Sequence, residues 1–250
     1  MEKFYIRLAD KAIAVSANYK ETKMFCGEFL IEEPEQADFE VKVTLDEMNK
    51  FRAILQERGI ESFGDKYLER ITLQKLINEE LSKYHVVTFH SSAIMVDQEA
   101  YLFTAPSGTG KSTHARLWRQ LLGERAVMIN DDKPMLRLDE DGGVTVFGTP
   151  WNGKHGLGSN ISAPLKCVCM LSQSPENRIE PQREKERFHT LFVQTYMSMS
   201  MQEMDAVSMK RIMEVMEGIA NKPMWHLECN ISEDAARLSY ETMSGKKVEE

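Results

Sequence analysis

The sequence predicts a mixed α/β protein, and three observations lead to this fold class. Short apolar runs of strand length alternate with segments in which apolar residues recur at helical spacing. A strand, a glycine-containing loop and a helix follow one another over residues 101–122. A further apolar strand ends in Asp131-Asp132. Strands that alternate with helices in this way are typical of α/β folds.

The first 80 residues are expected to form a small α/β region of unknown role. Strands are predicted at residues 4–8, 12–16 and 39–43. Thr44 and Glu47 have the spacing of a capping box, and the helix that follows them ends at Gly59. A second helix is expected from about Leu68 to Lys83, with three apolar side chains facing inward: Ile71, Leu76 and Ile77.

Residues 81–250 are expected to form a second domain. Strands are predicted at residues 86–89, 94–96, 101–104 and 127–129, and a helix at 111–122 that stops at Gly123. Residues 135–138 and 144–147 flank DEDGG as a hairpin, and the run LKCVCML is a buried strand. The polar segment 176–187 is expected to be a loop, and the last fifty residues are expected to be mostly helical.

The composition narrows the classes of function. The chain has 31 Lys and Arg against 39 Asp and Glu, a formal net charge of −8, which argues against a protein that coats nucleic acid or anionic membrane. No apolar run is long enough for a transmembrane helix, and the first residues lack the apolar region of a signal peptide. The four cysteines lack zinc-site spacing, so reduced thiols in a cytoplasmic protein are expected.

The loop before the 111–122 helix carries the clearest chemical motif. Residues 108–112 match the end of the phosphate-binding pattern G-x-x-x-x-G-K-[ST], although Ala105 stands where the first glycine belongs. Glycines let backbone amides surround an anion, and the helix N-terminus favours negative charge. The alternative is an ordinary glycine-rich helix cap. The expected nucleotide-binding residues are Ser107, Gly108, Thr109, Gly110, Lys111, Ser112 and Thr113.

Asp131 and Asp132 end a strand about twenty residues after Lys111. Two adjacent acids can divide their work, one holding a metal ion and the other accepting a proton from an attacking hydroxyl. The alternative is a solvated turn before Pro134. His90, just upstream of the loop strand, is by its residue context a structural hydrogen-bonding group.

Three segments taken together resemble a known nucleotide site. FHSSAIMVDQEAYLFTAPSGTGKST followed by INDDKPML is similar to the site shared by HPr kinase/phosphorylase and phosphoenolpyruvate carboxykinase. In both families a histidine-containing strand precedes an SGxGK[ST] loop, and a strand ending in Asp-Asp follows after one short helix. The likeness covers roughly residues 85–140. It implies an HPr kinase/phosphoenolpyruvate carboxykinase-like P-loop domain behind the small N-terminal α/β region.

The resemblance assigns a role to each matching position. Lys111 would contact the β- and γ-phosphates of ATP, and Ser112 would ligate Mg²⁺ or Mn²⁺. Asp132 would be the carboxylate on the metal side, and Asp131 the candidate general base. His90 would lie near the reacting phosphate, with Lys111 and Asp131 completing the catalytic set.

The resemblance implies an ATP-dependent kinase that transfers the γ-phosphoryl group to a hydroxyl of a small molecule, peptide or protein. Two alternatives stay open: an ATP-binding regulatory or accessory module without transfer, and an ATP-dependent carboxykinase. The expected partners are the nucleotide and a hydroxyl-bearing acceptor, without nucleic acid or membrane. A homo-oligomer is left open.

Two further features are ambiguous. The glycine-rich loop at residues 149–156 offers Lys154 and His155 as contacts to acceptor or phosphate, or is a surface loop anchored by Trp151. Seven methionines fall between Met197 and Met216. Helical spacing favours a flexible core seam for them, and an adaptable partner surface is the alternative.

Overall fold

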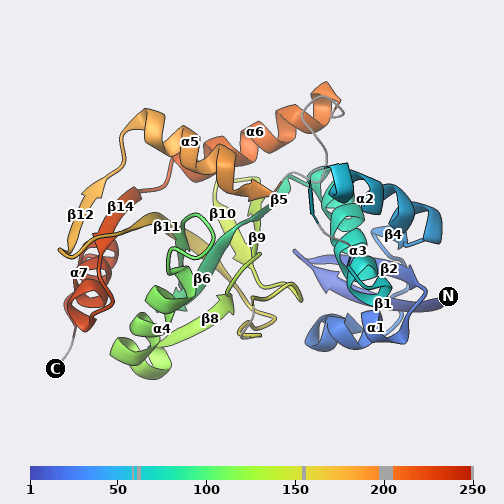
Figure 1. The fold of residues 1–250 in the computed structure, drawn as a ribbon, viewed down its shortest axis with the longest axis horizontal. Helices are drawn as coiled ribbons and strands as arrows, with labels where there is room; N and C mark the ends of the chain where they lie inside the picture. Colours follow the sequence, from blue (N-terminus) through green and yellow to red (C-terminus); the bar gives the residue numbers. More distant parts are fainter. Residues whose placement is uncertain (58, 61–62, 154–155, 197–204, 249–250) are drawn as a thin grey trace. The chain divides into compact units, whose positions relative to one another are not determined.

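The computed structural model describes residues 1–250 except 58, 61–62, 154–155, 197–204 and 249–250. The described chain divides into two compact units, Met1–Tyr84 and His85–Glu250. The first contains a four-stranded sheet and the second a ten-stranded sheet, each accompanied by helices (Figure 1). The predicted mixed α/β class is therefore confirmed.

The N-terminal unit is built on a sheet with strand order β3-β1-β2-β4. Its strands are β1 (Glu2–Leu8), β2 (Lys11–Ala17), β3 (Leu30–Ile31) and β4 (Phe39–Lys42). Its helices are α1 (Lys20–Cys26), α2 (Leu45–Glu57) and α3 (Asp65–Ser82), with a short 3-10 turn at Gly27–Phe29. β1 and β2 form an antiparallel hairpin. The amide of Glu47 donates to Thr44 Oγ1, one half of the expected capping box.

Two details of this unit differ from the prediction. Helix α1 was not expected, because the residues that lead into it are held by Glu69, a residue about fifty positions away. This buried carboxylate accepts hydrogen bonds from the amides of Asn18 (2.6 Å) and Tyr19 (3.1 Å) and from the Thr22 hydroxyl. Of the three side chains expected to face inward from α3, Ile77 is buried, whereas Ile71 and Leu76 are only partly buried.

The C-terminal unit is built on a sheet with strand order β13-β5-β9-β10-β11-β7-β6-β8, and β14 pairs with β11 and β12. The strands that precede α4 are β5 (Val86–Phe89), β6 (Ser91–Val96) and β7 (Glu99–Thr104). Those that follow it are β8 (Ala126–Asn130), β9 (Met135–Leu138), β10 (Val144–Phe147), β11 (Ser162–Gln173), β12 (Arg178–Pro181), β13 (Thr195–Tyr196) and β14 (Met224–Cys229). The helices are α4 (Lys111–Leu122), α5 (Glu184–Gln194), α6 (Ala206–Ala220) and α7 (Glu233–Ser244), with a 3-10 turn at Gly123–Arg125.

Successive side chains of this sheet point alternately into two separate hydrophobic cores. Ala93 and Leu102 belong to one core together with side chains of α5 and α6. Ile94 and Phe103 belong to the other, together with α4 and α7. Since successive residues of a strand point to opposite faces, this alternation places one helix pair on each face of the sheet. The sheet is therefore covered on both faces, and its strand ends are where a site can open.

Three expectations for this unit were wrong or incomplete. The polar segment 176–187 is ordered as β12 and the start of α5, because β12 pairs antiparallel with β14. The C-terminal region contains β14, which pairs parallel with β11, between two helices. Of the methionines on α6, Met216 is buried and Met213 is 39% exposed. The residues 197–204 of the methionine cluster lie outside the described part of the chain.

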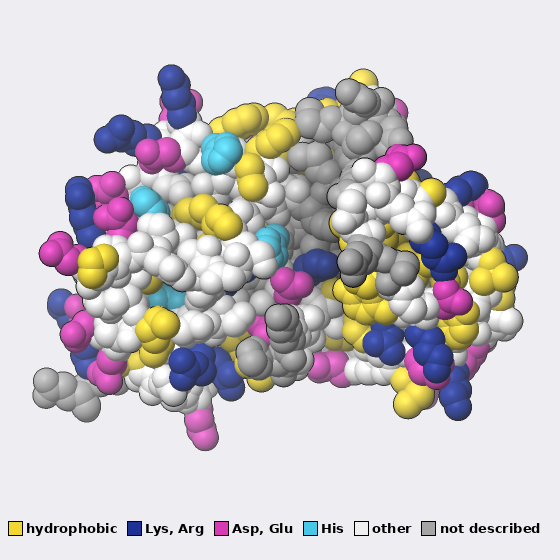
Figure 2. All heavy atoms as spheres, in the orientation of Figure 1, with side chains coloured by type: hydrophobic (Ala, Val, Ile, Leu, Met, Phe, Trp, Pro, Cys, Tyr) yellow, Lys and Arg dark blue, Asp and Glu magenta, His cyan; other side chains and the backbone are white. Residues whose placement is uncertain are grey.

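The surface of the described residues carries charges of both signs. Figure 2 shows Lys and Arg interspersed with Asp and Glu over the visible face, and hydrophobic side chains gathered over α5 and α6. Phe188 and Val193 of α5 are more than half exposed, at 54% and 56%. Within the described ranges, no helix is both long enough and apolar enough to cross a membrane.

Candidate functional site

The sheet topology brings the three predicted segments to one edge. β6 runs antiparallel to both of its neighbours, β7 and β8. Its first residues pair with the last residues of both, Ser91 with Thr104 and Ala93 with Asn130. The start of β6 therefore lies at the edge where β7 and β8 end. This edge carries His90, the loop before α4 and the two aspartates.

The loop between β7 and α4 has the backbone that a phosphate-binding loop needs. Gly108 (φ 81°) and Gly110 (φ 124°) adopt conformations that favour glycine. α4 begins at Lys111 directly after Gly110, so its unpaired N-terminal amides and the positive end of its dipole face the loop. Ser107 and Gly108 are exposed, which leaves the loop open to a ligand. Gln173 of β11 holds the loop from the side by donating to the Thr109 carbonyl at 3.2 Å.

Lys111, Asp132 and His90 form a linked set of polar side chains. Lys111 is 7% exposed, and its Nζ donates to the Ala105 carbonyl at 3.0 Å. Burial lowers the pKa of Lys111, and the charge of Asp132 opposes this shift. His90 Nε2 lies 3.4 Å from Asp132 Oδ1. Burial alone would raise the pKa of Asp132, but the His90 hydrogen bond and the charges of Lys133 and Lys111 outweigh it, so the pKa is lowered and the carboxylate is ionised at neutral pH.

Asp131 has a different environment from its neighbour. It is 3% exposed, whereas the side chain of Asp132 is 31% exposed. The amide of Gly153 donates a short hydrogen bond to Asp131 Oδ1. A Cβ at position 153 would lie 2.9 Å from that oxygen, so any other residue there would require the carboxylate to shift. The two acids are thus an enclosed carboxylate and a more accessible one.

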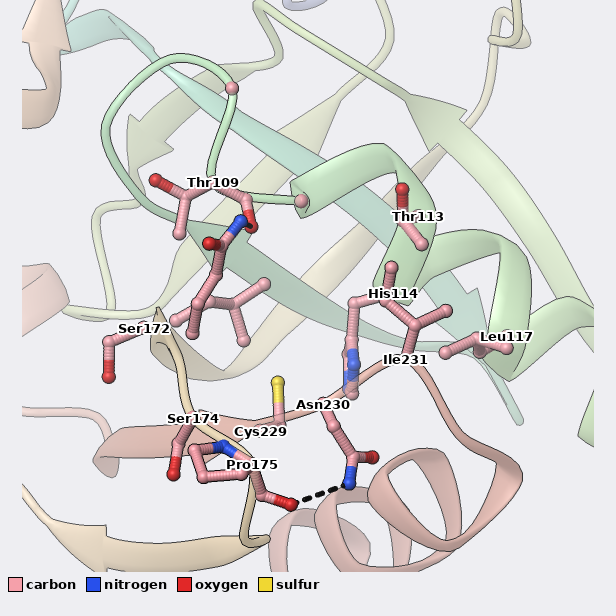
Figure 3. A pocket seen from close by; sticks show the side chains of 14 residues that line it. Thr109, Thr113, His114, Leu117, Ser172, Ser174, Pro175, Cys229, Asn230 and Ile231 are labelled. Atoms are coloured by element: carbon pink, nitrogen blue, oxygen red, sulfur yellow. Dashed lines mark hydrogen bonds between the residues drawn. The ribbon is translucent and has the colours of Figure 1, made fainter.

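A cavity of about 480 Å³ opens beside the loop. Figure 3 shows it between Thr109 and the first turn of α4 on one side and the ends of β11 and β14 on the other. Its lining is part apolar, with Leu117 and Ile231, and part polar, with Asn230, whose side-chain Nδ2 donates to the Pro175 carbonyl at 2.9 Å. A mixed lining of this kind suits a small organic ligand.

The donor set at the sheet edge fits a metal ion that arrives with a nucleotide. In the described part of the chain, no group of three or more His, Cys, Asp and Glu side chains could hold a metal ion by itself. Mg²⁺ in nucleotide sites needs only one or two protein ligands, since phosphate and water oxygens complete its shell. The accessible carboxylate of Asp132 and the hydroxyl of Ser112, in the first turn of α4, match this mode.

The structure brings most of the sequence-predicted residues together. Those that lie at this edge of the sheet or at the start of α4 are His90, residues 107–110, Lys111–Thr113 and Asp131-Asp132. Thr113 lines the cavity. Lys154 and His155 lie outside the described residues. Trp151 is buried, so it does anchor its loop.

Sequence reasoning missed three polar residues around the aspartates. Asn130 and Thr149 are fully buried and bonded to each other, with Asn130 Nδ2 donating to Thr149 Oγ1 at 3.0 Å. Lys133 is a mostly buried cation whose pKa is lowered by burial, against the opposing charge of Asp132. An asparagine at the end of an otherwise apolar strand was the available signal for the first of these.

Comparisons with known proteins add little to this site. No protein-family model and no curated protein matches the sequence. Among solved structures, the chain is similar to the Hpr(Ser) kinase/phosphatase from Coxiella burnetii, with 12% sequence identity and a TM-score of 0.34. The match covers 63% of this chain and 93% of that chain. This is a distant fold-level similarity, and the case for a function rests on the residues of the site.

Proposed function

We propose that the C-terminal unit binds ATP at the loop before α4 and transfers its γ-phosphoryl group to a hydroxyl acceptor. The observation that carries the proposal is the convergence of Lys111, His90 and the Asp131-Asp132 pair on one sheet edge. The linked charges of Lys111 and Asp132 support it further, because a phosphate site needs a cation and a metal-side carboxylate within reach of each other.

In this proposal the loop binds the phosphates of the nucleotide and the cavity binds its nucleoside. Backbone amides of residues 107–111 and the Lys111 ammonium would bind the phosphates, for which Lys111 exchanges its bond to the Ala105 carbonyl. The cavity lined by Leu117, Ile231 and Asn230 would take the nucleoside, since it borders Gly108–Gly110 directly.

The transfer itself is mostly positioning and charge stabilisation. The acceptor oxygen forms a bond to the γ-phosphorus as the bond to the bridging oxygen breaks, and ADP leaves. Asp131 accepts the acceptor's proton, and Lys111 stabilises charge on the transferred group. Ser112 and Asp132 would hold Mg²⁺, which neutralises phosphate charge when it is bound. His90 would hold the Asp132 carboxylate in position.

The binding half of the proposal is tested by calorimetry with Mg·ATP. We expect Lys111→Ala to weaken the affinity at least about tenfold, because a charge-assisted phosphate contact is lost. Arg116→Ala is the matched control, since Arg116 is an exposed cation on the same helix. Equal affinities of wild type and Lys111→Ala would refute the site.

The catalytic half is tested by screening metabolite and peptide libraries with γ-labelled ATP. We expect a labelled product with wild type, and a loss of at least about 100-fold in rate for Asp131→Asn with ATP affinity retained, as for removal of a general base. ATP binding without any product would favour the non-catalytic module. An assay with oxaloacetate separates the carboxykinase alternative.

A further inference from the structure

Asn130 lies wholly buried between the two loops of the site and uses both ends of its amide. Its Nδ2 donates to the carbonyl and hydroxyl of Thr149, at 3.1 and 3.0 Å. Its Oδ1 accepts from the amides of Asp132 and Lys133, at 2.8 and 2.7 Å. Because two N–H donors face one end and oxygens face the other, the orientation of the amide is determined by its partners.

Thr149 closes these contacts into a ring. Its hydroxyl accepts from Asn130 and donates to the Lys133 carbonyl at 2.8 Å. Thr149 is also fully buried. The turn that carries Asp131 and Asp132 is therefore fastened to the start of the 149–153 loop by hydrogen bonds in both directions.

The ring of hydrogen bonds formed by Asn130, Thr149 and Lys133 is connected to each of the two aspartates in a different way. The backbone of Asp132 is held directly, because its own amide donates to Asn130 Oδ1. The carboxylate of Asp131 is held by the 149–153 loop, because the Gly153 amide donates to Asp131 Oδ1. The strand on the other side contributes too, since the Ser92 hydroxyl donates to the Asp131 carbonyl at 3.3 Å and the Ser91 amide to the Asp132 carbonyl at 3.1 Å.

We propose that Asn130 and Thr149 are positioning residues that hold the Asp131 and Asp132 carboxylates in one fixed arrangement for metal and acceptor. The inference rests on the proposed function. A buried polar network adds little stability over apolar packing of the same volume, but when every group is paired it enforces one geometry. Groups that orient metal-side ligands typically contribute about 10–100-fold to metal affinity.

The test compares Thr149→Val, which keeps the shape and loses the hydroxyl, with Thr149→Ser, which keeps the hydroxyl. ATP affinity is measured by calorimetry with and without Mg²⁺. For Thr149→Val we expect an unchanged affinity for metal-free ATP and about a tenfold smaller gain on adding Mg²⁺. Thr149→Ser should recover most of the gain. Asn130→Ala, which removes the bonds to Thr149 and to both amides without adding charge, should lose at least as much of the gain and serves if that variant does not fold.

The outcomes separate the two proposals. If wild type binds ATP neither with nor without Mg²⁺, the proposed function fails and the positioning role falls with it. If wild type gains affinity with Mg²⁺ and both Thr149→Val and Asn130→Ala gain as much, only the positioning role is refuted. An equal loss of metal-free and Mg²⁺-dependent affinity in the folded variants would also refute it, because the residues would then support the fold generally.

Discussion

At the scale of single residues, buried polar side chains hold the elements that carry the candidate site. His114, in the first turns of α4, is 3% exposed, and its Nε2 lies 2.9 Å from the Ser239 hydroxyl. Trp118 Nε1 donates to the same hydroxyl at 2.8 Å. The ring of Phe103 packs edge-on against His114. This cluster fixes α4 against α7 and so fixes the helix N-terminus that faces the phosphate-binding loop.

The buried histidine predicts a pH dependence of stability. Burial lowers the pKa of His114 from 6.5 to about 4. Between these values the unfolded chain binds a proton that the folded chain excludes, so stability that is complete above pH 6.5 is lost as the pH falls towards 4. The loss should approach about 3 kcal/mol. Urea unfolding across this range should show a shallower decline for His114→Gln than for wild type, and parallel declines would contradict the assignment.

At the scale of elements, remote side chains complete helices that the local sequence leaves unfinished. No side chain at its own N-cap satisfies α1. Glu69 of α3 instead holds the residue that leads into the helix, accepting from the Asn18 backbone amide at 2.6 Å and from Asn18 Nδ2 at 2.8 Å. Because α1 is only seven residues long, its own propensity is too weak to stabilise it, and we expect it to depend on tertiary contacts such as this one.

Removing that carboxylate should therefore destabilise the N-terminal unit. We expect Glu69→Ala to cost at least about 2 kcal/mol in the free energy of unfolding, because several buried donors lose their acceptor. Glu80→Ala is a matched control, since Glu80 makes an exposed pair with Lys83 on the same helix and should cost less than about 1 kcal/mol. Denaturant unfolding measures both, and equal costs would argue against this role of Glu69.

The same elements show how far the sequence could lead. Strands and helices with local signals, such as β9 and β10 around a turn or α4 ending at Gly123, were predictable from periodicity and turn residues. Helix α1 and strand β14 were not, because a distant carboxylate and a parallel partner strand create them. In the site, the loop and the Asp-Asp pair carry sequence motifs, and Asn130 is recognisable as a polar end to an apolar strand, but its bond to Thr149 follows only from the fold.

At the scale of the whole molecule, every residue of the candidate site belongs to the unit His85–Glu250. A bound ligand stabilises the part of the chain that forms its site, by about 2.7 kcal/mol at a hundredfold excess over Kd. We therefore expect Mg·ATP to increase hydrogen-exchange protection in peptides covering residues 104–114 and 130–133. Protection confined to peptides of residues 1–84 would contradict the assignment of the site to the second unit.

The pairing of β6 with β8 has one more consequence. Ala93 pairs with Asn130 but Ile94 with Met128, so Ile129 is one residue more than the ladder needs. Its carbonyl instead accepts from the Ser159 amide at 3.1 Å. Such a bulge shifts by one residue the register of the strand residues that follow it, and so reverses which face of the sheet their side chains point to. The position of the two acids relative to the phosphate loop therefore depends on the number of residues in β8. A single-residue deletion at Ile129 would shift both acids by one position while removing no residue of the site.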